Sequence, residues 1–427
     1  MYNYHQRQEL LTEVHSRPFQ PFTAPLRLLH FAVLYDGVSA AVIEQEVLAA
    51  IRVLGFVFGK EHRGFLFVTN QQYAIRYEPH NEFYTLTLYH LNNGPPFTHM
   101  DELTRALPGA LLVELEIQCE RADAAEHIDH ACDAQCTCSQ DINSAIKTRF
   151  ASAQYCVSQV MNGSAIVATD FRIENDRQRV NILVKDIQLQ PAETGRLLQR
   201  LCELETYRHM ALLSLPTARE LMPEITVLDQ TLAKVSQRSG DDLSEVLSQM
   251  TELAAKVESI SAATANRFSA SDAYFALVER CIQELREQRI EGGQMIAEFM
   301  DRHLRPAQRT CDSAAARTEL LSRRIARATE LVQSQVNLHI EEQNKALLEA
   351  LNARSKRKMG LETKLESLSV VVVVYYLYDL MDLALKNLLH EGETLELMLT
   401  GLTMLLPFLL LLVMFMVRRL VRGYRDE

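Results

Sequence analysis

The C-terminal part of the chain contains two long apolar stretches, and these restrict the fold more than any other feature. The first covers residues 368–389 and the second residues 397–417, which makes 22 and 21 residues. A helix needs about 20 predominantly apolar residues to cross a bilayer. The polar segment HEGETLE separates the two stretches, so the sequence predicts a hairpin of two transmembrane helices.

Basic residues flank this predicted hairpin on both sides, and they favour two spans over one. They are Arg354, Lys356, Arg357, Lys358 and Lys364 before the first stretch, and Arg418, Arg419, Arg422 and Arg425 after the second. Basic flanks mark the cytoplasmic side of a span. Both flanks can lie on that side only if the chain crosses twice. This predicts a multi-pass protein of the inner membrane with both termini in the cytoplasm.

Two aspartates, Asp379 and Asp382, interrupt the first stretch and allow two interpretations. In the first, they lie near the outer end of the span, where they contact headgroups or water and Asp382 pairs with Lys386. In the second, their spacing of three residues puts them on one helix face that lines an aqueous path. In an oligomer they would then form rings of negative charge that attract cations. An acidic mouth outside the membrane would continue these rings, formed by Glu391, Glu393 and Glu396.

Residues 1–190 have the pattern of an α/β domain on the cytoplasmic side. Short segments rich in Val, Ile, Tyr, Phe and Thr are bounded by Gly, Asn, Asp or Pro, which predicts strands. These segments are residues 28–35, 63–69, 73–78, 83–91, 111–118, 164–170 and 179–186. Residues 39–55 have a helical pattern. The fold class we expect is therefore an α+β membrane protein, in which this N-terminal α/β domain precedes a helical region and the transmembrane hairpin.

Apolar residues recur at helical spacing from residue 191 onward. In residues 191–305 they alternate in steps of three and four, as in a coiled coil, and we expect a helical hairpin with breaks at Pro216 and near residues 236–242. A further break is expected at Pro306. From there one stalk helix over residues 306–367 leads without a stop into the predicted spans, and residues 418–427 form a basic tail.

Composition and motifs argue against several classes of function. The chain has 55 acidic residues against 44 basic residues and a formal net charge of −11, which disfavours nucleic-acid binding. It contains no Gly-x-x-x-x-Gly-Lys-Ser/Thr, no Gly-x-Gly-x-x-Gly, no Gly-x-Ser-x-Gly and no His-Glu-x-x-His motif. We therefore expect neither catalytic residues nor enzymatic activity.

Residues 127–141 concentrate metal-binding residue types. His127, His130, Cys132 and Cys136 lie within ten residues there, and soft ligands at this density could hold Zn²⁺. The spacing matches no pair of Cys-x2-Cys knuckles, so a solvated loop with reduced thiols is the competing interpretation. In a long chain without a signal peptide, all eight cysteines are expected to be reduced. We expect no cofactor other than a divalent cation, and zinc is disfavoured.

Distinctive segments recur along nearly the whole chain. They include ELLTEVHSRPF near the start, VATDFRIE, GRLLQRLCELETYRHMALLSLPTARELMPE, FMDRHLRPAQRTC and LESLSVVVVVYYL. In their sequence and order they resemble a bacterial family known only as domain of unknown function 3422, which is described as membrane-anchored. The resemblance implies a bacterial inner-membrane location and implies no activity.

The predicted layout is also similar to that of CorA-type divalent-cation channels, which join a cytosolic α/β domain to a long pore helix. Those channels carry Gly-Met-Asn after their first span, whereas this chain has LHEGETLE there. Two functions stay open: a CorA-like homo-oligomeric cation channel, transporter or sensor, and a non-transporting membrane-tethered scaffold that recruits a cytosolic protein. In both, the expected partners are the lipid bilayer and further copies of the chain. The sequence does not identify the recruited protein.

Overall fold

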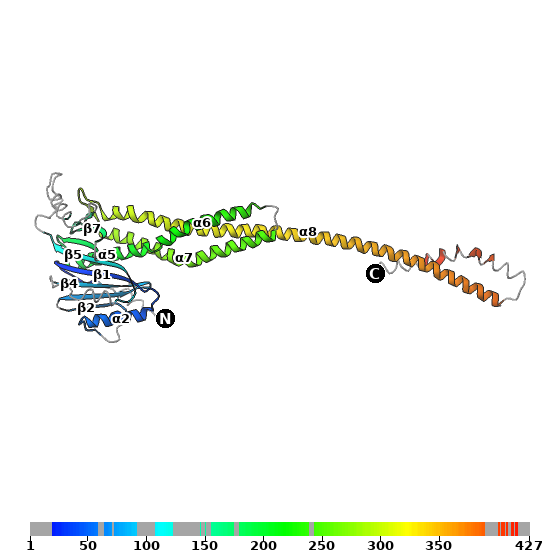
Figure 1. The fold of residues 1–427 in the computed structure, drawn as a ribbon, viewed down its shortest axis with the longest axis horizontal. Helices are drawn as coiled ribbons and strands as arrows, with labels where there is room; N and C mark the ends of the chain where they lie inside the picture. Colours follow the sequence, from blue (N-terminus) through cyan, green and yellow to red (C-terminus); the bar gives the residue numbers. More distant parts are fainter. Residues whose placement is uncertain are drawn as a thin grey trace, which may run out of the picture. The chain divides into compact units, whose positions relative to one another are not determined.

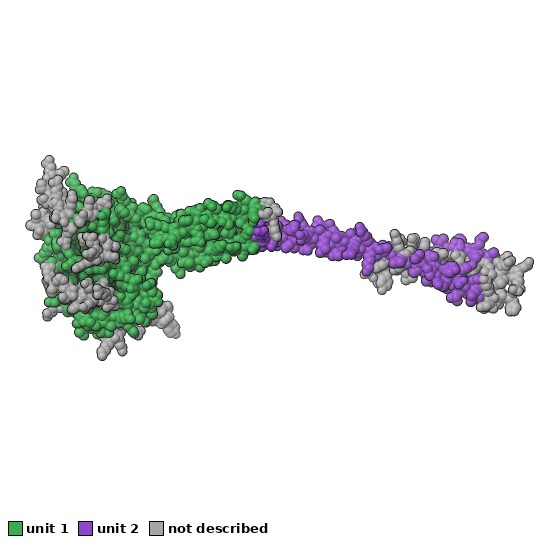
Figure 2. Space-filling view, in the orientation of Figure 1, with its two compact units in different colours: residues 1–239, 248–328 green, residues 240–247, 329–427 purple. Residues whose placement is uncertain are grey.

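The computed structural model describes residues 19–58, 64–70, 72–91, 107–122, 146, 150, 155–174, 179–238 and 243–388, and short helical pieces between 400 and 416. The chain divides into two compact units (Figure 2). One contains residues 1–239 and 248–328, and the other contains residues 240–247 and 329–427. The sheet and the hydrophobic cores described below belong to the first unit.

A mixed β-sheet forms the centre of the first unit (Figure 1). Over the described residues it has nine strands in the order β2-β3-β4-β1-β5-β8-β7-β6-β9. The strands are β1 (Leu26–Leu34), β2 (Leu66–Thr69), β3 (Tyr73–Pro79), β4 (Phe83–Leu91), β5 (Ala110–Arg121), β6 (Cys156–Val160), β7 (Ala165–Glu174), β8 (Arg179–Asp186) and β9 (Gln288–Arg289). Strands β5 and β8 pair in parallel, and the other neighbours pair antiparallel.

The sequence pattern predicts most of this sheet. The predicted strands coincide with β1 to β5, β7 and β8, and the predicted helix at residues 39–55 coincides with α2 (Ala40–Val53). Strands β6 and β9 are not predicted. Strand β6 reads CVSQV, and its Ser158 and Gln159 are buried among sheet partners although the residue types suggest a surface segment. The α/β part of the expected fold class is therefore correct.

Strand β1 contributes to two hydrophobic cores, one on each face of the sheet. Leu28 and Ala32 pack on the face that α5 covers, while Phe31 and Val33 pack on the face that α2 covers. Successive side chains of a strand point to opposite faces, so a central strand covered on both sides is apolar almost throughout. This double coverage explains why the segment LLHFAVL is nearly continuous in hydrophobic residues.

Four long helices follow strand β8 in the described residues, with β9 between the last two of them. They are α5 (Pro191–Leu212), α6 (Leu215–Ser236), α7 (Leu243–Leu285) and α8 (Ile296–Leu388). Helix α5 begins with a capping box, in which the backbone N–H of Gln190 donates to the Glu193 carboxylate over 3.0 Å. The predicted breaks near Pro216 and before Leu243 are confirmed. The prediction of one uninterrupted helix from the basic cluster into the first apolar stretch is also confirmed, because α8 contains both.

The predicted helix start at Pro306 is wrong, because α8 begins ten residues earlier. The carboxylate of Glu287 accepts hydrogen bonds from the backbone N–H groups of Ile296 and Ala297, at 3.0 and 2.8 Å. These bonds satisfy N–H groups that have no partner inside the helix. Pro306 then lies inside α8 on an exposed turn, where water can reach the carbonyl that its missing N–H leaves unbonded.

The predicted transmembrane hairpin is not supported. Among the residues that the structure describes, no helix is long and apolar enough to cross a membrane. The first predicted span lies in α8, where the apolar run from residue 368 onward meets Asp379 and, three residues later, Asp382. That run is shorter than the roughly 20 residues that a span requires. Residues 397–417 lie largely outside the described residues.

This finding corrects three predictions made from the sequence. The fold class is not an α+β membrane protein with a two-span hairpin, since the structure supports an α/β protein with a mixed sheet. The predicted multi-pass location in the inner membrane, with both termini in the cytoplasm, conflicts with the same finding. So does the description of the chain as a transmembrane transport protein. All three predictions depended on reading the two apolar stretches as spans, from their length and from the basic residues that flank them.

Candidate functional site

Two hollows in the described part of the first unit are lined in part by polar side chains. The smaller one, which we call the polar cavity, lies between the sheet and α5 and has a volume of about 70 Å³. Because a water molecule takes about 30 Å³ of liquid volume, the polar cavity has room for about two waters. Its lining residues are His30, Arg76, Glu78, His80, Phe83, Thr85, Thr87, Tyr89, Gln199, Cys202, Glu203, Thr206 and Tyr207.

His30 is a deeply buried titratable group of the polar cavity, with 4% of its surface exposed. Its Nδ1 lies 2.8 Å from the hydroxyl of Thr87, and its Nε2 lies 2.9 Å from the hydroxyl of Thr206. Burial, with smaller effects from the charges of Arg76 and His80, lowers the pKa of His30 to about 3. A ring with so low a pKa stays neutral at pH 7 and is a poor general base. The role of His30 is therefore structural, because its hydrogen bond to Thr206 connects β1 to α5.

Arg76 is the buried cation of the polar cavity. Its guanidinium donates to the carboxylate of Glu78 and to the amide oxygen of Gln199, both over 2.8 Å. Burial alone would lower the pKa of Arg76, but the Glu78 carboxylate more than offsets this and raises it. The charge is therefore kept and neutralised inside the protein, and the hydrogen bond to Gln199 connects β3 to α5.

The described cysteines do not supply a reactive thiolate. Cys119, Cys156, Cys202, Cys281 and Cys311 are all free and buried. Burial, together with the charge of Glu203, raises the pKa of Cys202 and raises that of Cys281 to about 11. A nucleophilic cysteine requires a lowered pKa instead. These five cysteines agree with the prediction of reduced thiols and behave as small core residues.

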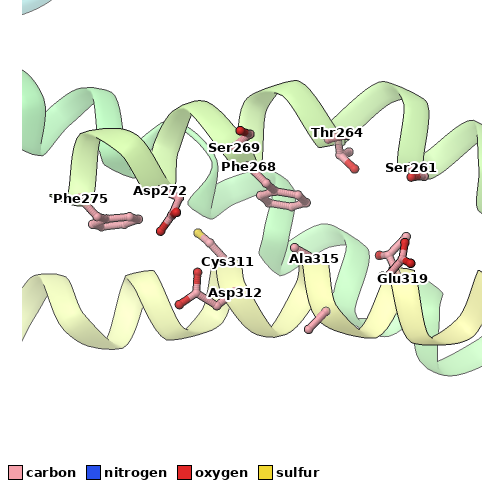
Figure 3. Close-up of a pocket in the computed structure, with 13 residues that line it drawn as sticks. Ser261, Thr264, Phe268, Ser269, Asp272, Phe275, Cys311, Asp312, Ala315 and Glu319 are labelled. Carbon is pink, nitrogen blue, oxygen red and sulfur yellow. The ribbon is translucent and has the colours of Figure 1, made fainter. Parts of the chain in front are cut away.

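The larger hollow is an open groove between α7 and α8, with a volume of about 490 Å³ (Figure 3). We call it the α7–α8 groove. Its lining residues are Ser261, Thr264, Ala265, Phe268, Ser269, Asp272, Phe275, Cys311, Asp312, Ala315, Ala316, Thr318 and Glu319. Most of these side chains are small, so the two helices leave an indentation between them. Phe268 and Phe275 are buried beneath it.

Carboxylates lie at both ends of the α7–α8 groove. Figure 3 shows Asp272 of α7 and Asp312 of α8 at one end, and Glu319 at the other. Partial burial and the nearby charge of Asp272 raise the pKa of Asp312. Glu319 accepts a hydrogen bond from Arg323 over 2.7 Å, whereas Asp272 and Asp312 form no ion pair with any described residue. The Asp272–Asp312 end therefore favours a positively charged ligand group.

Helix α6 and the residue before it also contact α8. The hydroxyl of Ser214 lies 3.1 Å from the sulfur of Cys311, and Arg317 donates to the hydroxyl of Thr226 over 3.5 Å. Arg324 forms an ion pair with Asp229 further along. Helices α6, α7 and α8 thus run side by side in the first unit (Figure 1).

The structure tests the sequence-predicted site residues only in part. His127, His130, Cys132 and Cys136 lie outside the described residues, and so do the acidic-mouth residues Glu391, Glu393 and Glu396. Asp379 lies exposed on α8 and Asp382 is half-buried there. In the described ranges, no group of three or more His, Cys, Asp or Glu side chains could hold a metal ion.

Sequence reasoning missed both hollows. The polar cavity joins His30, Thr87 and Thr206, which are far apart in the chain and share no motif. The one available signal was a histidine inside the otherwise apolar segment LLHFAVL. The α7–α8 groove had a clearer signal in the alanine- and serine-rich segments SISAATA and DSAAA, whose small side chains leave room between helices.

Comparison with known proteins gives a family without a known activity. No curated protein matches the chain. A family model described as protein of unknown function DUF3422 matches residues 2–423, which confirms the resemblance seen in the sequence. The chain therefore belongs to the DUF3422 family.

Proposed function

We propose that this chain is a non-enzymatic scaffold that binds another protein chain along α8. The observation that supports this most is the exposure of leucines on α8 after residue 328. Leu347 is 60% exposed and Leu351 is 52% exposed. Six further leucines of this part of α8 are also more than half exposed: Leu331, Leu338, Leu348, Leu361, Leu365 and Leu368. A helix with an exposed apolar stripe gains stability when another protein covers that stripe.

The chemistry of the hollows supports a binding role over a catalytic one. In the polar cavity, His30 and Arg76 are held by neighbouring side chains and connect strands to α5. The buried thiols are protonated at neutral pH. The α7–α8 groove is shallow, open and lined by small side chains, as expected for a surface that receives a helix.

A photo-cross-linking experiment tests the scaffold proposal. A benzophenone amino acid replaces Leu347 in the full chain, and the protein is irradiated in cells that express it. We expect protein adducts of higher mass on denaturing gels, because the Leu347 side chain would lie within an interface. The matched control places the same amino acid at Glu349, two residues away and on the opposite side of α8.

The two positions distinguish a specific interface from general stickiness. Adducts from position 347 that are absent from position 349 support a binding face on α8. Equal labelling at both positions, or no protein adduct at position 347, contradicts the scaffold proposal. Mass spectrometry of the adduct identifies the bound chain, whether a second copy or another protein.

A further inference from the structure

We propose that residues 347–368 of α8 bind an acidic amphipathic helix of another protein. This inference rests on the proposed scaffold function and deepens it, because it names the chemistry of the bound chain. All the residues that form this surface belong to the second unit. The bound helix would cover exposed leucines of α8 with apolar residues of its own. Between them it would place two carboxylates opposite Arg354 and Lys358.

Seven residues of this segment recur in alternating steps of four and three and form one face of α8. Five of them are leucines that are more than half exposed, and two exposed basic residues lie between the leucines. On a straight helix of 3.6 residues per turn, the seven positions fall within an arc of about 100°, so they share one face. We call this face the α8 seam. Its residues are Leu347, Leu351, Arg354, Lys358, Leu361, Leu365 and Leu368.

The side of α8 opposite the seam is polar. Glu349, Asn352 and Lys356 lie there, roughly 140–200° around the helix from Leu347. The seam itself extends over 21 residue steps, or about 32 Å at 1.5 Å per residue, which is three heptads. A helix with one exposed apolar face of this length is suited to pair with another amphipathic helix.

The centre of the α8 seam is positively charged. Arg354 and Lys358 are four residues apart, a spacing at which like charges destabilise a helix. Arg357 adds a third positive charge within the same turn. Among the residues that the structure describes, Arg354 forms no ion pair. Carboxylates on a bound helix would offset the repulsion between these basic residues, so charge complementarity favours an acidic partner.

The same charges argue against a second copy of the chain as the bound helix. A parallel, in-register pair would place Arg354 and Lys358 opposite their own counterparts. An antiparallel pair that covers the leucines would bring Arg354 opposite Lys358, or Lys358 opposite its own counterpart. Each arrangement leaves like charges facing one another at the centre of the pair, which is destabilising. The leucines of the seam therefore need a partner of different sequence.

The position of the charges also favours a protein helix over a lipid surface. A helix that lies on a bilayer keeps its basic residues on the polar face and turns its apolar face towards the acyl chains. Arg354 and Lys358 lie within the apolar face, about 20° to either side of Leu347. A protein helix can offer a carboxylate to each of these charges at that depth, whereas acyl chains cannot.

A peptide-binding experiment tests this chemistry on the full chain. The probe is a fluorescein-labelled helical peptide as long as the α8 seam, with leucines opposite the leucines and glutamates opposite Arg354 and Lys358. The control peptide has lysines in place of these two glutamates. We expect fluorescence anisotropy to show roughly tenfold or more tighter binding of the glutamate peptide, because two attractions become repulsions in the control. Equal affinities, or tighter binding of the lysine peptide, overturn the proposal.

Charge reversal in the chain locates the binding on the seam. We expect Arg354→Glu to weaken binding of the glutamate peptide by roughly tenfold. The double variant Arg354→Glu, Lys358→Glu should prefer the lysine peptide. Lys356→Glu makes the same charge change on the opposite side of the helix and is the matched control, which should bind as the wild type does. Equal losses from Arg354→Glu and Lys356→Glu would indicate general charge attraction and overturn the proposal.

The photo-cross-linker at position 347 extends the test to the partner in cells. We expect its protein adduct to disappear when Arg354→Glu is added and to persist when Lys356→Glu is added. An adduct that survives both changes, or that contains a second copy of the chain, leaves the scaffold function standing and overturns the acidic helix. The absence of any adduct contradicts the scaffold function, and this inference falls with it. Binding to phosphatidylserine vesicles that depends on Arg354, without binding of the glutamate peptide, assigns the seam to a lipid surface and also overturns the proposal.

Discussion

The sheet of the first unit and the α8 helix beyond residue 328 contain similar apolar residue types with opposite exposure. Phe31 and Leu115 in the sheet have 0% of their surface exposed, whereas most leucines of α8 after residue 328 are more than half exposed. Val374, at 1% exposed, is the exception among the described residues of that helix segment. The comparison shows that an apolar side chain becomes buried only where another part of the protein packs against it.

The two regions differ in where that second surface comes from. Strand β1 finds its neighbours β4 and β5 in the same chain, at positions 49 or more residues away. Such long-range pairs make the sheet cooperative. Most described side chains of α8 beyond residue 328 are exposed, and contacts between residues three and four apart stabilise a helix only weakly. The sheet is therefore expected to resist unfolding on its own, and this part of α8 to gain most from association.

The largest expected effect is the loss of a buried aromatic ring from the sheet. Replacing Phe31 with Ala leaves a cavity in the core between the sheet and α2, because the surrounding strands relax only in part. We expect the free energy of unfolding to fall by about 3–5 kcal/mol. Urea denaturation followed by the near-ultraviolet circular dichroism of the tyrosines measures this change.

Phe19→Ala is the matched control, because the Phe19 ring is 42% exposed. It should change the free energy of unfolding by about 0.5 kcal/mol or less. If the two phenylalanine variants lose similar amounts of stability, the contrast between buried and exposed apolar residues fails within the first unit itself.

A smaller loss is expected from the polar cavity, where burial depends on hydrogen bonds. Thr206→Val keeps the shape of the side chain but removes the hydroxyl that lies 2.9 Å from Nε2 of His30. A buried ring nitrogen then has no partner at that position, which costs about 1–3 kcal/mol. Thr231→Val on α6 serves as the control, because its side chain is only partly buried and its hydroxyl donates to the carbonyl of Val227 in the same helix. Equal losses in the two variants would show that the hydroxyl of Thr206 does not stabilise the fold.

The comparison also explains how much of the molecule could be predicted from the sequence. Strand β1 could be predicted from the sequence because its alternating side chains enter two cores, which makes the segment apolar. Helix α8 could be predicted because apolar residues recur at helical spacing for many turns. The start of α8 could not be predicted, because Glu287 caps it from another segment. The polar cavity was hidden for the same reason, since His30 meets Thr206 across 176 positions of sequence. The first apolar C-terminal stretch misled because its length was weighed above Asp379 and Asp382 inside it.

The protonation of His30 makes the stability of the first unit depend on pH. The pKa of its side chain is about 3 in the fold, because burial disfavours the charged ring, against 6.5 for an exposed histidine. Above pH 6.5 both states are neutral and the full stability is present. As the pH falls from about 6.5 towards 3, only the unfolded state takes up the proton, and stability is lost. One proton corresponds to at most about 1.4 kcal/mol per pH unit in that window.

A comparison of slopes isolates this group from the carboxylates that also titrate. The free energy of unfolding is measured between pH 7 and pH 5 for the wild type and for His30→Gln, which cannot be protonated in this range. We expect the wild type to lose stability more steeply on acidification, whatever the absolute stabilities are. Parallel curves would mean that His30 is equally accessible to protons in both states.

The smallest expected effect belongs to the exposed part of α8. Replacing Leu347 with Ala removes a side chain that is 60% exposed, and alanine is at least as good a helix former as leucine. At protein concentrations too low for self-association, the tyrosine signal of the sheet should therefore unfold at an unchanged urea concentration. A change in the free energy of unfolding within about 0.5 kcal/mol agrees with this. A loss close to that of Phe31→Ala would place Leu347 in the cooperative core of the same chain and remove the contrast between the two regions.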